Sequence, residues 1–484
     1  MLLIKIGCCI HKVIFVFLLS ILILEGSSKR LLNVSLCQAD HNFTKEEERK
    51  LGKKFNYELE RHLQFIKDPS IKEYIDRVGM NIISQLEYRP FDFRFYVYVA
   101  SDPNAFATPG GYIYISTGLI TLAENECELA GVISHEVAHV TARHIAKMIE
   151  KQGKLNLGTL AAILAGIFLG GSGEAASAIG VFSVATAQTL SLKYTRENEE
   201  EADRLGISNM VKARYDGSGM LSFLKKLKRH HLPTFEPPPY LLTHPGIEMR
   251  INYLEIMLNR LSKPEDPRSN IEDFRRMQAR MIAYSWSPQN AVNYFRSKLK
   301  SDPERLDLIC GLALANQTME NYSNAVKGFK MALSTHPDDS EILRDLGICY
   351  FSQGSPSDAV RSLERSVALN DRDLSALYYL GRAYQETGNF QDAIKSYLRV
   401  RRLRKDYIDV YYNLGEVYGK KGLLGESHIS FGAFFKLKGK LDPALFHFKK
   451  ASEYYDKAAK ERKEVLKEIK EVQELIKKKK LRGR

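Results

Sequence analysis

The sequence is poor in cysteine and lacks a long hydrophobic run. Six cysteines occur in 484 residues, and their spacing forms neither a Cys-x-x-Cys metal site nor a disulfide framework. The most apolar stretch, Val13 to Leu24, is shorter than the roughly 20 residues that span a bilayer. A formal net charge of +13 comes without a nucleic-acid-binding motif. These absences argue against a disulfide-stapled domain and a nucleic acid partner, and we expect Cys310 and Cys349 to be buried packing residues.

The N-terminus has the layout of an export signal. Lys5 and Lys12 precede the apolar run, and Gly26-Ser27-Ser28 follows it. A basic region, a short apolar core and small residues form a secretory signal peptide. We expect residues 1–28 to be this signal and 29–45 to be an N-terminal linker. An uncleaved signal that anchors the protein in the membrane is the alternative.

The motif His135-Glu136-Val137-Ala138-His139 carries most of the chemical information. In a helix, side chains four residues apart lie on the same face, so both imidazoles suit two positions around a tetrahedral zinc. Glu136 then lies beside whatever the two histidines bind. The spacing is that of the zinc-hydrolase signature HEXXH. A catalytic zinc takes three protein ligands, so a third ligand is needed.

Glu199 is the candidate for that third ligand. It opens an acidic segment that reads as a helix, and Asp203 lies four residues later on the same face. Asp203 is then placed to hydrogen-bond a ligand imidazole. The competing interpretation of these acids is a solvated helix surface paired with arginines. The presence of the HEXXH motif favours the metal site.

Several motifs, in order along the chain, resemble those of a known peptidase family. After HEXXH come Glu199-x-x-Ala202-Asp203, Thr243-His244-Pro245 and Arg250, and Asn104-Ala105-Phe106 precedes them. Together they resemble the gluzincin metallopeptidases related to HtpX, the mitochondrial Oma peptidase and the CAAX prenyl protease. The resemblance covers roughly Glu46 to Leu261, and we expect a peptidase domain at 46–262 with a small β-sheet among helices.

The resemblance implies one zinc ion per chain, held by His135, His139 and Glu199, with Glu136 as the general base. His244 then either donates to the oxyanion or ligates the zinc and closes its open position. Arg250 is expected to polarise the substrate carbonyl or hold substrate.

Substrate binding has a separate candidate in Tyr112, Ile113 and Tyr114, a β-rich run after Gly110-Gly111. An exposed edge strand here would bind an extended peptide by strand addition. An internal core strand is the alternative. Residues 155–187, rich in Ala, Gly and Leu, form either a flexible lid near the zinc or a membrane-inserted segment.

The C-terminal half repeats with a period of 34 residues, the length of a tetratricopeptide unit. Two columns contain small residues and one contains large apolar residues. The first small column is Ala279, Ala313, Gly347, Gly381 and Gly415; the second is Ala291, Ala325, Ala359, Ala393 and Ser427; the large column is Phe295, Phe329, Leu363, Tyr397 and Phe431.

The same spacing restarts half a unit late, at Gly432, Ala444 and Phe448, which predicts one helix shared by two units. We expect a linker at 263–270, repeats at 271–452, and a basic helix and tail at 453–484. That last helix is either a cap or a contact for anionic lipid through Lys477 to Lys480.

The predicted fold is mainly α, a gluzincin-type metalloprotease domain followed by an α-solenoid of repeats. The combination is similar to that of periplasmic proteases that assist β-barrel assembly. It implies an exported zinc endopeptidase acting on misfolded or stalled envelope proteins, with the outer-membrane assembly machinery and peripheral membrane contact as further expected partners. The alternative is a chaperone or scaffold with a latent metal site.

Overall fold

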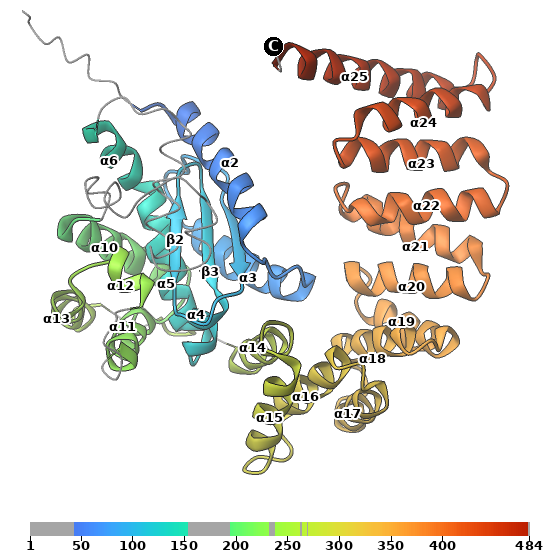
Figure 1. The fold of residues 1–484 in the computed structure, drawn as a ribbon. Coiled ribbons are helices and arrows are strands. Elements are labelled where there is room, and N and C mark those ends of the chain that lie inside the picture. Colours follow the sequence, from blue (N-terminus) through green and yellow to red (C-terminus); the bar gives the residue numbers. More distant parts are fainter. Residues whose placement is uncertain (1–42, 153–193, 232–237, 262–263, 269, 483–484) are drawn as a thin grey trace, which may run out of the picture.

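The computed structural model describes residues 43–152, 194–231, 238–261, 264–268 and 270–482. The predicted signal peptide and the segment 155–187 lie outside these residues. Within the described part, every helix is too short or too polar to cross a membrane. Figure 1 shows helices gathered around a small sheet in the N-terminal half, followed by a stack of paired helices. The expectation of a mainly α protein with these two parts is confirmed.

Helices and three short strands build the N-terminal half. The helices are α2 (Lys45–His62), α3 (Pro69–Ile83), α4 (Thr117–Leu122), α5 (Glu126–Thr141), α6 (His144–Gln152), α10 (Arg196–Lys212), α11 (Ser218–His231), α12 (Pro239–Thr243) and α13 (Ile247–Leu258). The strands are β1 (Arg94–Tyr98), β2 (Ala105–Thr108) and β3 (Tyr112–Ser116).

The three strands form one sheet in the order β1-β3-β2. β1 runs parallel to β3, and β2 runs antiparallel to it. Gly110 and Gly111 make the tight connection from β2 to β3 with φ angles of 84° and 90°, a left-handed conformation that favours glycine. These two glycines therefore form the tight turn that precedes β3.

The position of β3 contradicts the expectation that Tyr112, Ile113 and Tyr114 bind substrate by strand addition. β3 is hydrogen-bonded on both sides and all five of its residues are buried, so it offers no free edge. Ile113 faces a core shared with α3 and α5, while Tyr112 and Tyr114 face a second core with α2 and α6. The alternative, an internal core strand, is correct.

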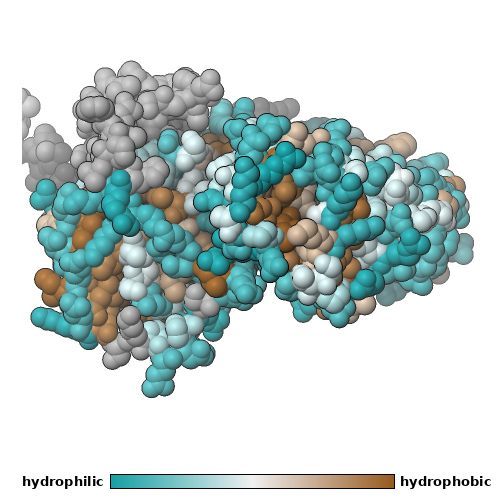
Figure 2. Space-filling view, turned by 90° about the horizontal axis from the view of Figure 1, so that it is seen from below, coloured by the Kyte–Doolittle hydropathy of each residue, from teal (hydrophilic) through white to brown (hydrophobic). Residues whose placement is uncertain are grey.

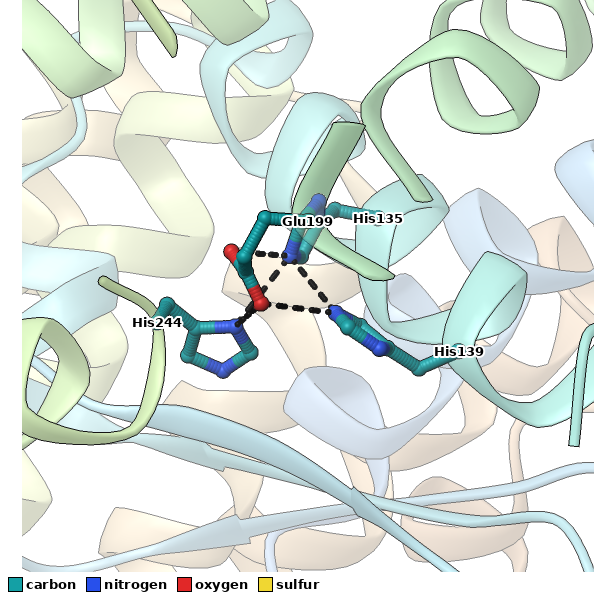
Figure 3. A group of neighbouring side chains, drawn as sticks. All are labelled: His135, His139, Glu199 and His244. Atoms are coloured by element: carbon teal, nitrogen blue, oxygen red, sulfur yellow. Dashed lines mark hydrogen bonds and ion pairs between the residues drawn. The ribbon is translucent and has the colours of Figure 1, made fainter. Parts of the chain in front are cut away.

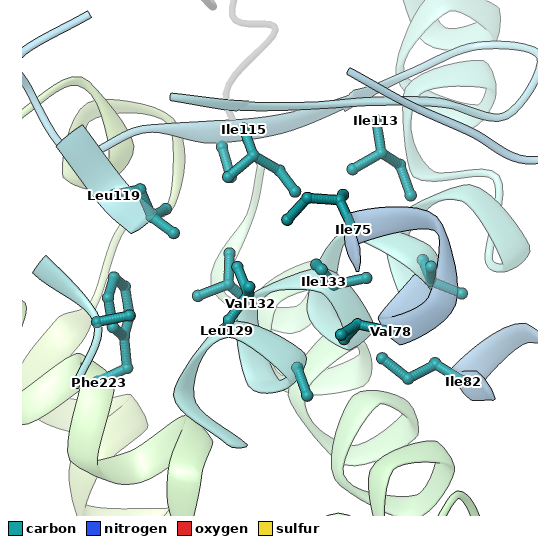
Figure 4. Close-up of a cluster of buried hydrophobic side chains, with 14 of the residues drawn as sticks. Ile75, Val78, Ile82, Ile113, Ile115, Leu119, Leu129, Val132, Ile133 and Phe223 are labelled. Atoms are coloured by element: carbon teal, nitrogen blue, oxygen red, sulfur yellow. The ribbon is translucent and has the colours of Figure 1, made fainter. Parts of the chain in front are cut away.

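The first of these cores holds the long helix α5 against the sheet. Ile113 and Ile115 project toward Ile75 and Val78 of α3, with Ile133 of α5 packed beside them (Figure 4). Burying one such side chain stabilises a fold by roughly 1.5–3 kcal/mol. The side chain of Asn125 caps α5 by accepting a hydrogen bond from the Glu128 amide at 3.0 Å. The helix that carries HEXXH is therefore fixed at its start and along its length.

The second half is a series of antiparallel helix pairs that rises from α14 at the bottom of Figure 1 to α25 at the top. They are α14 (Ile271–Ser285), α15 (Pro288–Leu299), α16 (Leu306–Thr318), α17 (Tyr322–Thr335), α18 (Ser340–Ser352), α19 (Pro356–Leu369), α20 (Leu374–Glu386), α21 (Phe390–Leu403), α22 (Ile408–Lys420), α23 (Leu424–Leu437), α24 (Leu441–Glu453) and α25 (Lys460–Arg482).

The small and large columns of the repeat meet inside each pair. A Cβ atom added to Gly347 would lie 2.5 Å from Leu363, and one added to Gly381 would lie 2.6 Å from Tyr397. Such distances are below any normal carbon contact, so only glycine allows the helices this close approach. The repeat pattern predicted from the sequence is confirmed, and Cys310 and Cys349 are buried within it.

Helix α23 serves two units, as the half-unit shift predicts. Its Ser427 hydroxyl donates to the Gly415 carbonyl of α22 at 2.7 Å. Gly432, farther along the same helix, packs against Phe448 of α24. α25 then covers α24 through the buried Val465 and Val472, which agrees with a capping helix.

Helix α14 belongs to both halves of the protein. Phe274, Met277 and Met281 lie in the core of the N-terminal domain, while Ala279 and Ile282 lie in the core of the first repeats. The boundary expected at 263–270 therefore precedes a helix that is packed on both sides.

Buried charges also cross this junction. Arg280 of α14 contacts Asp68, the N-cap of α3, at 3.3 Å and also pairs with Asp345 of α18. Arg344 contacts the same Asp345 at 3.0 Å and Asp373 at 2.9 Å. The solenoid is thus joined to the N-terminal domain by apolar packing and by ion pairs.

The underside of the molecule is largely hydrophilic, with smaller hydrophobic areas between the polar side chains (Figure 2).

Candidate metal centre

The two histidines of HEXXH lie together on the inner face of α5. Their Nε2 atoms are 2.9 Å apart, and both side chains are buried (Figure 3). The one-turn spacing in a capped and fully packed helix produces this geometry directly. The pair presents two nitrogen lone pairs to one point.

Helix α10 brings Glu199 to that point. Thr195 caps α10 and its side chain accepts from the Asn198 amide, so Glu199 lies in the first helical turn. The Oε1 atom of Glu199 is 3.4 Å from Nε2 of His139, and its Oε2 is 3.5 Å from Nε2 of His135. α10 lies close to α5, as shown by the hydrogen bond that the Ser134 hydroxyl donates to the Gly206 carbonyl at 2.7 Å.

His244 completes the group from the end of α12. Its Nδ1 atom is 3.0 Å from Oε1 of Glu199 and 3.2 Å from Nε2 of His135. The ring of Tyr240 stacks on it with centroids 4.4 Å apart, and the His244 side chain is fully buried. The structure therefore gathers four candidate ligand atoms within 4.8 Å of one another, from His135, His139, Glu199 and His244.

The spacing of these atoms fits a small divalent cation. In a tetrahedral zinc site with bonds near 2.0–2.1 Å, ligand atoms are about 3.3 Å apart. The observed separations of 2.9 to 3.5 Å bracket that distance. Oε2 of Glu199 is buried and accepts no hydrogen bond of normal geometry from the described residues, although Nη1 of Arg250 lies 2.7 Å from it. A cation at the centre would be held by Oε1 of Glu199 together with the three imidazole nitrogens.

Asp203 lies where the sequence predicts, behind the first ligand. Its Oδ1 is 2.8 Å from Nδ1 of His135. Tyr253 donates to its other oxygen. Burial raises the pKa of Asp203, but Arg250 and His135 outweigh burial and hold that pKa below its ordinary value. Asp203 is therefore an ionised acceptor for the Nδ1–H of His135, so in the neutral imidazole Nε2 is the nitrogen that is free to bind a cation in the cluster.

Arg250 has a different place from the one expected. Its Nε and Nη2 donate to the two oxygens of Asp203 at 2.8 and 2.7 Å, and its Nη1 is 2.7 Å from Oε2 of Glu199. Because carboxylates of the protein occupy the guanidinium, the expectation that Arg250 polarises a substrate carbonyl is not supported. Arg250 positions the acidic side chains around the ligands.

Glu136 lies beside the cluster, next to His244. Its Oε1 is 3.4 Å from Nε2 of His244, and neither carboxylate oxygen accepts a hydrogen bond in the described part of the chain. Burial raises the pKa of Glu136, which favours the protonated form. A buried carboxylate of raised pKa beside a cation site is suited to accept and return a proton.

Three neighbouring residues were missed by reasoning from the sequence. His144 lies behind His139, Glu201 lies behind His144, and the ring of Tyr194 stacks on His139 with centroids 3.8 Å apart. His144 is five residues from His139 and so does not share its helical face. Arg143 has a φ of 55°, and this left-handed residue turns the chain so that His144 points back.

Comparisons with known proteins agree with these two parts. Residues 69–257 match the model of peptidase family M48. Residues 381–422 match a TPR repeat model, and residues 318–400 match a model described as anaphase-promoting complex, cyclosome, subunit 3.

Similar proteins are named for protease activity. The beta-barrel assembly-enhancing protease of Escherichia coli (strain K12) is 31% identical over 247 residues, 51% of this chain and 50% of that protein. A Vibrio cholerae protein that carries the same name provisionally is 38% identical over 190 residues, 38% of this chain and 39% of that protein. The mitochondrial metalloendopeptidase OMA1 of Schizosaccharomyces pombe is 28% identical over 182 residues, 38% of this chain and 51% of that protein. The chain thus spans about half or less of the length of these relatives.

Proposed function

Because the chain joins an M48 peptidase domain to tetratricopeptide repeats, we propose that it is a zinc-dependent endopeptidase of the bacterial envelope. The observation that carries this proposal is the buried cluster of His135, His139, Glu199 and His244 with Glu136 beside it. His135, His139 and Glu199 are the proposed zinc ligands, and Asp203 orients the first of them.

In the proposed peptide hydrolysis, the metal and Glu136 have separate roles. When bound, zinc lowers the pKa of a water ligand and polarises a carbonyl group. Glu136 accepts a proton as the peptide carbonyl is attacked, and then returns that proton to the leaving amine. Burial raises the pKa of Glu136, which makes its carboxylate a stronger base for the first of these two proton transfers.

His244 is proposed to hold the site inactive. Its Nδ1 lies within 3.0–3.2 Å of Glu199 and His135, in the place of a fourth ligand. A zinc with four protein ligands is structural in character, since no position remains for water. His244→Ala should then raise basal proteolysis. Lower activity with zinc retained would instead assign His244 to stabilising the oxyanion.

Substrate is proposed to bind along β2. This strand pairs with β3 on one side only within the described residues, its four residues are buried, and it packs beside α5. A peptide that pairs with the second edge of β2 would run past the HEXXH helix. The similarity to beta-barrel assembly-enhancing proteases supports misfolded or stalled envelope proteins as the substrate class.

The repeats are proposed to recruit these substrates or the outer-membrane β-barrel assembly machinery. Solenoids of this kind present extended surfaces that bind peptides and proteins. Export to the periplasm rests on the signal expected at residues 1–28, and anchoring by an uncleaved signal remains the alternative. Lys477 to Lys480 are exposed on α25 and are available for peripheral contact with anionic lipid.

A chaperone or scaffold with a latent metal site is the second candidate, and the ligand-like position of His244 favours it. The Glu136→Gln variant separates the two, because it removes the base and keeps every ligand. We expect the purified variant to retain one zinc per chain, to lose cleavage of an unfolded protein, and to co-purify with uncleaved substrate. Glu200→Gln, on the exposed face of α10, is the matched control. Cleavage by Glu136→Gln at the wild-type rate would refute the proposed base.

A further inference from the structure

A chain of polar contacts leads from the cluster to the protein surface through His144. Nδ1 of His139 is 2.8 Å from Nδ1 of His144. Nε2 of His144 is 3.1 Å from Oε2 of Glu201. His144 is completely buried, whereas the Glu201 side chain is 49% exposed. The contacts therefore run from a buried ligand, through a buried histidine, to a carboxylate that water reaches.

The proton positions along this chain follow from its outer end. An ionised carboxylate only accepts hydrogen bonds, so Nε2 of His144 donates to Glu201. Neutral His144 then has an unprotonated Nδ1, which accepts the Nδ1–H of His139. Nε2 of His139 is left unprotonated and faces the other ligand atoms, 3.4 Å from Oε1 of Glu199. Each acceptor thus fixes which nitrogen of the next histidine carries the proton, from Glu201 at the surface to His139 in the cluster.

The two histidines of HEXXH are supported in different ways. His135 donates directly to Asp203, which is buried and held by two bonds from Arg250. Among the described residues no carboxylate contacts Nδ1 of His139, and its contact there is with Nδ1 of His144. A ligand histidine commonly donates its other N–H to a carboxylate or carbonyl, and loss of that acceptor weakens metal binding.

We propose that His144 and Glu201 are positioning residues that fix the tautomer and ring orientation of His139 and so raise the affinity of the site for zinc. The proposal rests on the proposed function only in taking His139 as a zinc ligand. It adds two residues to the site and makes the exposed Glu201 an outer determinant of metal affinity.

The test is zinc affinity, measured by competition with a chromogenic chelator on the full-length protein. We expect His144→Leu to weaken zinc binding by about 10- to 100-fold. Glu201→Ala should act in the same direction with a smaller effect, because a water molecule can replace part of its role. Glu200→Ala is the control, since Glu200 pairs on the surface with Arg204 at 2.6 Å and lies off this chain of contacts.

A double-mutant cycle separates positioning from simple packing. If Glu201 acts through His144, the variant with both substitutions should bind zinc no more weakly than His144→Leu alone. His144→Gln, whose amide oxygen can accept from His139, should restore part of the affinity. Thermal unfolding of the zinc-free variants checks that the fold is intact.

The outcomes are distinct. Absence of zinc binding by the wild-type protein would refute the proposed function itself. Zinc binding by the wild type and equal affinity in His144→Leu would overturn this inference alone. Independent, additive losses from His144→Leu and Glu201→Ala would also overturn it, because they would show that Glu201 does not act through His144.

Discussion

The ring of Phe274 lies 6.5 Å from the ring of Tyr74, measured between centroids. Phe274 belongs to α14, the first helix of the solenoid, whereas Tyr74 belongs to α3 of the N-terminal domain. Both residues are buried in one core. The core of the N-terminal domain therefore includes a helix that lies beyond the linker.

Phe274→Ala should destabilise the whole protein, because it leaves a cavity in this shared core. Removal of a buried phenylalanine side chain costs about 3–5 kcal/mol. Urea unfolding followed by the fluorescence of Trp286, the only tryptophan, reports directly on the end of α14. Phe446→Ala, at a site that is 61% exposed, should leave the midpoint unchanged. An unchanged midpoint for Phe274→Ala would mean that the stability of the N-terminal domain does not depend on α14.

Arg250→Leu should lower both stability and zinc retention. The substitution leaves Asp203 and Glu199 buried without their shared cation. Breaking a buried ion pair by removing one partner costs about 3–5 kcal/mol. Chemical denaturation and metal analysis of the same preparation measure the two effects. The surface variant Arg204→Leu should alter neither, and a stable Arg250→Leu protein with full zinc content would contradict the positioning role.

Asp345 should make the junction sensitive to acid. Burial raises its pKa, but Arg280 and Arg344 outweigh burial and hold the pKa below its ordinary value. A carboxylate with a lowered folded-state pKa stabilises the protein above its unfolded pKa, about 3.9, and that stability is lost as pH falls through the folded-state value.

The corresponding variant is Asp345→Asn. At pH 7 it should lose about 3–5 kcal/mol, since two buried arginines lose a partner. Its stability should then fall less than that of the wild type between pH 5 and strongly acidic pH. Urea midpoints across this range measure both effects, with the exposed Asp358→Asn as the control. Equal acid sensitivity in Asp345→Asn and wild type would refute the role of this residue.

Gly347→Ala should destabilise the solenoid, although alanine is the better helix former. The added Cβ would lie 2.5 Å from Leu363, and overpacking of this kind costs about 1–3 kcal/mol. In Gly419→Ala the nearest atom is the Ser427 hydroxyl oxygen at 3.4 Å, so that variant should be at least as stable as wild type. Thermal unfolding followed by circular dichroism compares them. Equal melting temperatures would show that the helices can separate without cost.

The sequence was most informative where function depends on local spacing. HEXXH and the acids of α10 are set by helical periodicity, so His135, His139, Glu199 and Asp203 could be predicted together. The small-residue columns of the repeats could be predicted from the sequence for the same reason.

The rest of the site depends on contacts between distant segments. The central place of β3 depends on which strands pair, and that is not encoded in its own residues. Arg250 was correctly singled out, but its partners are 47 and 51 residues away, and only the structure shows that they are protein carboxylates. His144 escaped notice because a single left-handed residue, Arg143, reverses the direction of its side chain.

The helix shared by two units, α23, also changes how the array ends. A helix that closes one pair and opens the next adds one helix to the array where a full unit would add two. Beyond it α24 packs on α23, and α25 packs on α24 through the buried Val465 and Val472. Lys477 to Lys480 are exposed near the end of α25. An array with a shared helix can therefore be extended by one helix at a time, and the shared helix determines which helix forms its end.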